Sequence, residues 1–215
     1  MTDLNRNNIF LRGLAVRNDR RAATLLITEM AVLTAIVVIL QLLGSFIRFG
    51  PFSISLVLVP IVVGASLYGP LAGAWLGLVF GIVVLASGDA AAFLTIDPAG
   101  TVVTVLLKGT LAGFVSGLAY RLIEEKNRLI AVFVAAILCP VVNTGVFLVG
   151  CVLFFLPTVR AWGADAGYAN AAAYMFFGLA GGNFLFELLF NLVLAPAVHR
   201  VLLLVSSKVR ARNKR

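Results

Sequence analysis

The sequence is poor in the residues from which most catalytic and metal sites are built. It contains a single histidine and two cysteines, and no His-Glu-x-x-His pattern, which argues against a zinc-protease site. It also has no Gly-x-x-x-x-Gly-Lys-Ser/Thr loop, so it does not hold ATP phosphates by that route. No basic patch interleaved with aromatic residues suggests a nucleic-acid surface. We therefore expect no metal, no cofactor, no nucleic-acid partner and no enzymatic activity.

The two cysteines, Cys139 and Cys151, fall in the same apolar run. Their separation along the chain corresponds to about 18 Å of continuous helix. A disulfide needs Cα atoms closer than about 7 Å, so the two thiols cannot bridge each other within one helix. We expect both to be buried free thiols.

Charge is scarce as well. Only 12% of the 215 residues are charged, whereas 61% are hydrophobic, and the mean hydropathy is +1.07. A soluble domain contains roughly 45–50% apolar and about 25% charged residues. The composition predicts an all-α integral membrane protein that crosses the cell membrane several times and contacts bilayer lipid.

Six apolar segments fill the chain between two basic ends. At 1.5 Å per residue, about 20 apolar residues cross the roughly 30 Å hydrocarbon core of a bilayer. The second segment is short and contains Pro60, which makes it a candidate for a kink. We predict a tail over 1–22, a six-helix membrane domain over 23–205 and a tail over 206–215. The six predicted spans are Ala23–Phe46, Ile54–Leu67, Leu71–Ala86, Thr101–Leu122, Ile130–Leu156 and Ala171–Val205.

The positions of the basic residues predict the orientation of the chain. Of the seventeen Lys and Arg residues, five lie before Ala22, three between Arg121 and Arg128, and six from Arg200 onward, which makes fourteen. Cytoplasmic loops carry an excess of Lys and Arg, so this distribution predicts that both termini are cytoplasmic. Three longer segments then face outward and could form a lid over a binding mouth: Ser45–Ser53, Ser87–Gly100 and Pro157–Asn170.

Lys108 lies in the middle of the fourth predicted span. An ammonium at that depth costs roughly 2.5–3.5 kcal/mol on insertion scales, so a chain that retains it gives it a partner or a task. One interpretation is an internal ion pair with Glu187, or a side chain that extends outward to the interface. The other is a cation that receives an anionic group of a ligand from the outer mouth. The sequence leaves both open.

Other polar residues mark the same region as a candidate substrate-binding site. Asn183, Glu187 and Asn191 are spaced one helical turn apart and share one face of the last span. Polar groups inside a bilayer face the bundle interior, where asparagines either bind a ligand or bond to a neighbouring helix. The full candidate set is Lys108, Asn143, Asn183, Glu187 and Asn191 in the spans, with Asp97 and Trp162 in the outer segments.

Two further patterns point to a family. Ala31 and Ala35 form a small-x-x-x-small pair in the first span, which by itself indicates close helix packing. The segment Leu58–Val83 contains a Gly-Ala…Tyr-Gly-Pro-x-Ala-Gly core, followed by a small-rich fourth span and a fifth span with Pro and Asn-Thr. Together these features resemble the substrate-binding S components of prokaryotic energy-coupling factor (ECF) vitamin transporters. The core residues are Gly64, Ala65, Tyr68, Gly69, Pro70, Ala72 and Gly73.

The resemblance implies a membrane subunit that captures a vitamin from outside. It also implies a membrane coupling protein and two cytoplasmic ATPases as partners, with Ala31 and Ala35 on the face that docks to the coupling protein. The ligand would lie near the outer face between the last three spans and the outer segments. A buried cation suits a vitamin with a carboxylate, so pantothenate is the preferred candidate; cobalamin, folate, riboflavin and other small solutes stay open.

Two other classes of function are alternatives. A membrane-embedded hydrolase would need an acid or base within the bilayer, and Glu187 with Asn183 and Asn191 is the candidate group. An autonomous secondary transporter usually shows inverted repeats, and we see no convincing repeat between the two halves of this sequence.

Overall fold

The computed structural model describes residues 3–46, 48–49, 52–53 and 56–212, and the side chains of 23–45 and 56–204. Parts of the two predicted tails, residues 1–2 and 213–215, lie outside this described part. The chain is almost entirely helical, with one short hairpin. Its elements in order are α1 Asp3–Phe46, β1 Arg48–Phe49, β2 Phe52–Ser53, α2 Leu58–Tyr68, α3 Pro70–Ala86, α4 Ala91–Leu94, α5 Pro98–Ile123, α6 Arg128–Phe154, α7 Leu156–Asp165, α8 Ala171–Ala173, the π-helix η1 Tyr174–Gly181, and α9 Gly182–Arg212.

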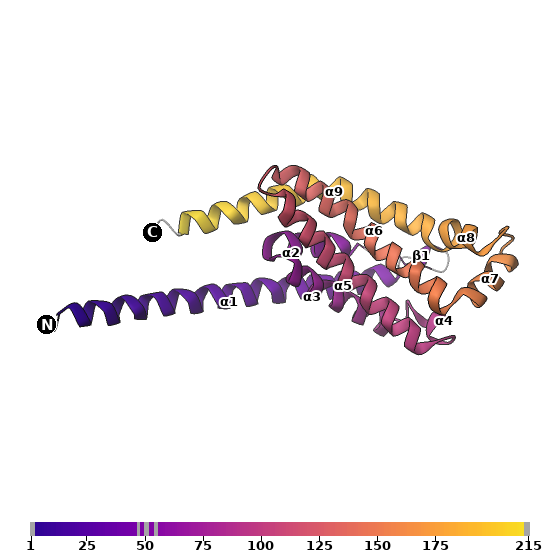
Figure 1. The fold of residues 1–215 in the computed structure, drawn as a ribbon, viewed down its shortest axis with the longest axis horizontal. Helices are drawn as coiled ribbons and strands as arrows, with labels where there is room; N and C mark the ends of the chain where they lie inside the picture. The colour runs from indigo at the N-terminus through magenta and orange to yellow at the C-terminus, as the bar shows by residue number, and fades with distance from the viewer. Residues whose placement is uncertain (1–2, 47, 50–51, 54–55, 213–215) are drawn as a thin grey trace.

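The long helices run along one axis and leave two chemically different ends. The start of α1 and the end of α9 lie at the same end of the bundle (Figure 1). The opposite end, which we call the distal end, carries α4, α7, α8 and the antiparallel β1–β2 hairpin, in which Arg48 is opposite Ser53. This arrangement agrees with an even number of crossings; the side of the membrane that each end faces stays a prediction.

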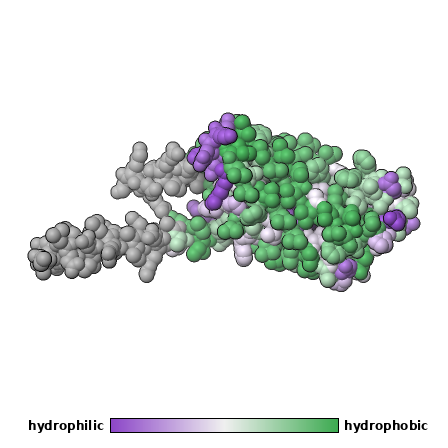
Figure 2. Space-filling model, viewed as in Figure 1, coloured by the Kyte–Doolittle hydropathy of each residue, from purple (hydrophilic) through white to green (hydrophobic). Residues whose placement is uncertain are grey.

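Four helices are long and apolar enough to cross a membrane, as judged by length and composition. Two shorter apolar helices, α2 and α3, accompany them. Figure 2 shows a mostly hydrophobic surface along the bundle, with hydrophilic residues gathered at the turn between α5 and α6 and at the distal end. The prediction of a helical membrane protein is confirmed at this level, and the count of six spans stays a prediction. The four long candidates are Ala23–Ser45, Pro98–Ile123, Arg128–Phe154 and Ala171–Leu204.

A sharp turn separates α2 from α3. Gly69 has a φ of +96°, a conformation that glycine adopts without strain, and its N–H still bonds to the carbonyl of Ala65 at 3.0 Å. Pro70 follows at the first turn of α3, where a missing N–H costs nothing. The hydroxyl of Tyr68 donates to Oε2 of Glu29 at 2.6 Å, which joins this turn to α1. The Tyr-Gly-Pro sequence therefore forms the tight turn that it predicts.

Glycines bring α3 and α5 into backbone contact. A Cβ atom at Gly73 or Gly77 would collide with the carbonyl of Gly113 or Gly109, and one at Gly81 would lie 2.8 Å from the carbonyl of Val105. Without a strong hydrophobic force between helices in lipid, such close approach supplies much of the packing energy. The two glycine stripes thus form one seam, which we call the α3–α5 seam.

The structure corrects several sequence-based assignments. A proline inside a span predicts an interruption, but α6 continues through Pro140 from Arg128 to Phe154. The outer segment Pro157–Asn170 is mostly the helix α7, and Ser87–Gly100 contains α4 and the first turn of α5. The periodicity of these short segments is too brief to separate a helical turn from a loop. Both cysteines are free and buried, as predicted.

The last predicted span combines two helical geometries. Eight residues, Tyr174–Gly181, form the π-helix η1, and α9 continues from Gly182. A π-helical stretch is rare and frequently lies at a functional site. The sequence analysis did not predict it, and the asparagines and glutamate of this span begin directly after it.

Candidate functional site

Lys108 is held between aromatic rings from two neighbouring helices. Its Nζ atom lies 5.6 Å from the ring centroid of Phe80 on α3 and 5.6 Å from that of Phe147 on α6. A cation at this distance from a ring face is attracted by the ring quadrupole, by about 2 kcal/mol or more when water is excluded. The adjacent residue, Gly109, belongs to the α3–α5 seam, so the backbone that carries Lys108 is fixed against α3.

Two carboxylates act on the Lys108 charge. The ammonium interacts electrostatically with Glu187 on α9 and with Asp89, which precedes α4. Such partners offset part of the cost of burying a cation. The structure therefore supplies internal counter-charges for Lys108. Contact between this ammonium and a ligand stays a prediction.

The polar face of α9 contains the three residues that the sequence grouped together. Glu187 is 1% exposed and Asn191 is 3% exposed. Asn183 donates through Nδ2 to Oε1 of Glu187 at 3.0 Å, whereas Asn191 donates to the Glu187 backbone carbonyl at 2.8 Å. Asn183 thus orients the glutamate side chain, while Asn191 uses its amide within its own helix.

Two buried polar groups lie on the neighbouring helices α5 and α6 at different levels: Thr104 packs against Gly150, and Asn143 lies about two turns away along α6. Asn143 on α6 and Thr104 on α5 are each 4% exposed. Among the residues that the structure describes, neither Oδ1 of Asn143 nor Oγ1 of Thr104 has a hydrogen-bond partner. Asn143 lies one turn from Phe147, whose ring contacts Lys108, and Thr104 lies one turn before Lys108 on α5. Leaving such groups unsatisfied costs roughly 1–3 kcal/mol each, which is typical of groups reserved for a ligand or for water.

An aromatic cluster covers this polar group on the distal side. Phe93 on α4 packs edge-on against Phe147, Phe155 and Trp162, with ring centroids 5.6, 5.0 and 5.6 Å away. Edge-to-face pairs of this kind add about 0.5–1.5 kcal/mol each beyond the burial of area. The predicted site residue Trp162 therefore lies next to Phe147, which contacts Lys108.

Asp97 has a structural task at the start of α5. Its Oδ1 accepts from the Gly100 N–H at 2.9 Å, which makes it the N-cap of the helix, and Pro98 occupies the first turn. The Thr101 hydroxyl adds a bond of 2.7 Å to the Asp97 carbonyl. A part for Asp97 in binding stays a prediction.

The first helix presents its small residues outward. Ala31 and Ala35 are both exposed on α1, in a surface that also exposes Val32 and Ile36. The inward side of α1 is tied to α3 by a bond of 3.2 Å from Nε1 of Trp75 to Oγ1 of Thr34. Ala31 and Ala35 are therefore accessible to a partner, and their docking role stays a prediction.

Sequence reasoning missed several residues around Lys108. Phe80 and Phe147 gave no signal, because an aromatic residue in an apolar span is ordinary. Gln41 and Asp89, by contrast, carried one: Gln41 is a polar residue within the first span, and Asp89 lies in an outer segment. The hydrogen bond of 2.8 Å between Gln41 and Asp89 could not be predicted, because the two residues are far apart in the chain.

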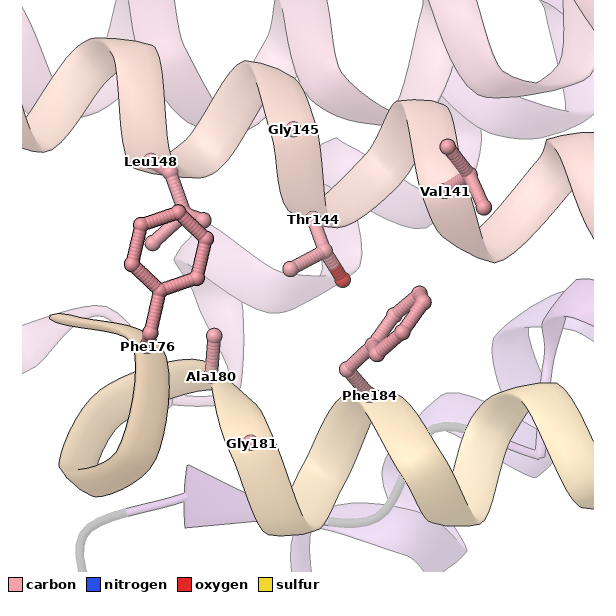
Figure 3. A pocket seen from close by; sticks show the side chains of 8 residues that line it. All are labelled: Val141, Thr144, Gly145, Leu148, Phe176, Ala180, Gly181 and Phe184. Atoms are coloured by element: carbon pink, nitrogen blue, oxygen red, sulfur yellow. The ribbon is translucent and has the colours of Figure 1, made fainter.

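A groove lies on another side of α6. It has a volume of about 220 Å³ and is bounded by α6 on one side and by η1 and α9 on the other (Figure 3). Its lining is almost wholly apolar, and it contains none of the predicted site residues. Among the described residues, no group of His, Cys, Asp or Glu side chains could hold a metal ion. The buried polar group around Lys108 is therefore the candidate site. The groove residues are Val141, Thr144, Gly145, Leu148, Phe176, Ala180, Gly181 and Phe184.

Comparison with known proteins identifies the family. Residues 25–199 match the profile of the family described as "ECF transporter, substrate-specific component". A solved structure of ThiT from Listeria monocytogenes has a similar fold, with a TM-score of 0.60 over 82% of this chain and 94% of that chain, at 22% sequence identity. Among curated proteins, none matches this chain by sequence. Since the family profile covers most of its length, the chain belongs to the substrate-specific components of ECF transporters, which are membrane transport subunits rather than enzymes.

Proposed function

We propose that this chain captures a small water-soluble vitamin at the cluster of polar residues around Lys108, which we call the chamber. One observation carries the proposal: the Lys108 ammonium lies between two aromatic rings, and unsatisfied polar atoms of Thr104 and Asn143 are buried one helical turn from Lys108 and from Phe147. This is the composition of a small-molecule site, in which apolar and aromatic walls surround a few placed polar groups. Membership of a substrate-specific family supplies the reason for such a site in a membrane protein.

The proposal includes an orientation. Six crossings with both termini in the cytoplasm turn the distal end outward, because fourteen of the seventeen basic residues then lie inside. The vitamin reaches the chamber from outside, and α4 and α7 close over it. In this arrangement the aromatic cluster of Phe93 and Trp162 forms the cover.

Pantothenate is the first vitamin to test. Its carboxylate would bind the Lys108 ammonium as a charge-assisted hydrogen bond, and its apolar part would lie against Phe80 and Phe147. Glu187 and Asp89 already attract this ammonium, so a carboxylate ligand competes with them for it. This competition gives the proposal a signature: removing the Glu187 charge should strengthen the binding of an anionic vitamin.

The decisive experiment measures binding to the purified chain alone by calorimetry, with pantothenate, folate, riboflavin and cobalamin. We expect one of them to bind tightly. Lys108→Met should weaken that binding, and Lys126→Met is the matched control, since Lys126 is exposed at the turn between α5 and α6. If no vitamin binds, or if both lysine variants bind as the wild type does, the proposal is wrong.

The partners are a membrane coupling protein and two cytoplasmic ATPases that drive release to the inside. The exposed face of α1 with Ala31 and Ala35 offers a surface for close helix packing against the coupling protein. Ala31→Leu together with Ala35→Leu should abolish co-purification with the coupling module and leave vitamin binding unchanged. Loss of vitamin binding in this variant, or intact co-purification, would contradict the assignment of the face.

A further inference from the structure

Gln41 is a polar residue that the first helix buries within its apolar stretch. Its side chain is 1% exposed, and its Nε2 donates to Oδ2 of Asp89 at 2.8 Å. Among the described residues, its other amide atom, Oε1, has no hydrogen-bond partner. Only one of the two polar atoms of this amide is therefore hydrogen-bonded: Nε2 is held by Asp89, and Oε1 is buried without a donor among the described residues.

The fixed end leads to the candidate site. Asp89 also accepts from the Ser87 hydroxyl at 3.1 Å, and its charge acts on the Lys108 ammonium. The segment that contains Asp89 continues into α4, whose Phe93 packs against Phe147, and the Phe147 ring contacts Lys108. Gln41 is therefore bonded to the segment that borders the candidate site. This bond brings α1 to the chamber, although the sequence and the family resemblance place the chamber among the last three spans.

The chemistry of the Gln41 amide is fixed by its partner. A carboxylate only accepts hydrogen bonds, so the NH₂ group must face Asp89 and the carbonyl oxygen must face away from it. The remaining atom, Oε1, is therefore an acceptor that cannot rotate into a donor. A ligand group next to it must bring an N–H or an O–H, and a ligand carboxylate would be repelled both by Oε1 and by Asp89.

We propose that Gln41 is a specificity-determining residue of the substrate site, which accepts a hydrogen bond from a hydroxyl or N–H group of the ligand. The inference rests on the proposed function and sharpens it: an anionic ligand group lies toward Lys108, and a neutral donor group of the same molecule lies toward Gln41. A site built around a buried acceptor discriminates strongly against analogues that lack the donor, because the acceptor then stays unpaired.

A purely structural role is the competing explanation, in which Gln41 only ties α1 to the rest of the bundle. The chain offers a matched control for it, because Thr34 on the same helix accepts a hydrogen bond from Trp75 on α3 at 3.2 Å. Thr34→Val and Gln41→Met each remove one polar link to α1. Only Gln41→Met removes an acceptor from the candidate site.

The test measures Kd by calorimetry and the thermal unfolding midpoint without ligand, in detergent, for the full chain. The probes are pantothenate, folate, riboflavin and cobalamin, together with a derivative of the bound vitamin in which its hydroxyl groups are methylated. We expect Gln41→Met to raise Kd about tenfold or more, the scale of a hydrogen bond in a buried site. Thr34→Val should leave Kd within about twofold while lowering the unfolding midpoint at least as much as Gln41→Met.

The methylated derivative separates a direct contact from an indirect one. It should bind the wild type about tenfold more weakly than the parent vitamin, and the Gln41→Met variant should barely distinguish the two. Gln41→Glu serves as a second variant if Gln41→Met does not fold, and it should weaken binding because it places a carboxylate next to Asp89. If a vitamin binds the wild type but these variants keep its Kd, the inference about Gln41 is wrong and the proposed function stands. If no probe binds the wild type, the proposed function fails and the role of Gln41 fails with it.

Discussion

The two sides of α5 and its neighbours differ sharply in how they pack. At the α3–α5 seam, Gly77 and Gly109 bring two backbones into contact, so that neither position has room for a single extra carbon. Between α6 and η1, a groove of about 220 Å³ runs along the surface, and Gly145 on its wall has nothing within 4 Å of an added Cβ atom. The α3–α5 seam has no room for a larger side chain at these glycines, whereas the groove beside Gly145 has such room.

This difference assigns separate tasks to the two sides. Lys108 is carried by the tight side, because its neighbour Gly109 is locked against α3. Glu187 is carried by α9, which follows the π-helix η1 on the open side. The two charges that interact in the candidate site therefore come from helices on different sides, one closely packed and one beside the groove.

The largest expected effect comes from adding a methyl group to the seam. Gly77→Ala places a Cβ atom against the carbonyl of Gly109, so the two helices must separate. We expect a loss of about 2–3 kcal/mol in the free energy of unfolding, the upper range for overpacking. Denaturant unfolding in detergent measures it. A loss of unfolding free energy below the error of the method would mean that the α3–α5 seam accommodates the methyl group and does not differ from the groove side in this respect.

The next effect concerns the tight side directly. Lys108→Ala should weaken vitamin binding by about 1–2 kcal/mol or more, the scale of a hydrogen bond to a charged group. Calorimetry gives the affinity, and unfolding gives the stability of the same variant. Unchanged affinity with lowered stability would instead show that Lys108 serves only its internal partners, above all Glu187.

A smaller effect should come from the start of α5. Asp97→Ala removes the side-chain acceptor of the Gly100 N–H and should cost about 1 kcal/mol of stability. Asp165→Ala is the matched control, since Asp165 is exposed at the end of α7. The affinity of Asp97→Ala for the vitamin tests whether Asp97 also binds the ligand. A loss of binding free energy greater than the loss of stability would support the predicted binding role of Asp97.

The smallest expected effect is a gain in stability, opposite in sign to the loss expected for Gly77→Ala. Gly145→Ala is the same substitution as Gly77→Ala, but it is made on the open side, in the interior of α6. Alanine favours a helix over glycine by roughly 0.5–1 kcal/mol, and nothing obstructs the new methyl group, so the variant should be slightly more stable. A marked destabilisation here would show that the groove wall is as constrained as the seam.

The sequence predicted the parts of the fold that depend on local pattern. Glycines four residues apart in two apolar segments are a local pattern that favours close helix contact, and Gly77 does meet Gly109. The grouping of Asn183 with Glu187 followed from helical spacing, and the structure joins them by a hydrogen bond. These features need only the period of a helix and the cost of polar groups in lipid.

The features that the sequence analysis missed depend on partners distant in the chain or on broken periodicity. Gln41 meets Asp89 across 48 positions, and nothing in either segment points to the other. The π-helix η1 adds no residue type that a helix would avoid, so its sequence reads as ordinary helix. The cap formed by Asp97 was missed for a different reason: an aspartate directly before a proline and an apolar run is a helix-start signal, and the analysis did not use it.

The unequal lengths of the apolar helices have a consequence for the surrounding lipid. Helix α6 has 27 residues and extends about 40 Å, whereas α3 has 17 and extends about 25 Å. Helix α3 nevertheless faces outward, with Leu71 79% and Ile82 52% exposed. Compared with a hydrocarbon core of about 30 Å, α3 is too short and α6 is longer than needed, so the two sides have hydrophobic mismatch of opposite sign. A molecule with such an uneven belt relieves both by inclining its axis and thinning the bilayer along α3, so the acyl-chain length of a host membrane bears on how upright it stands.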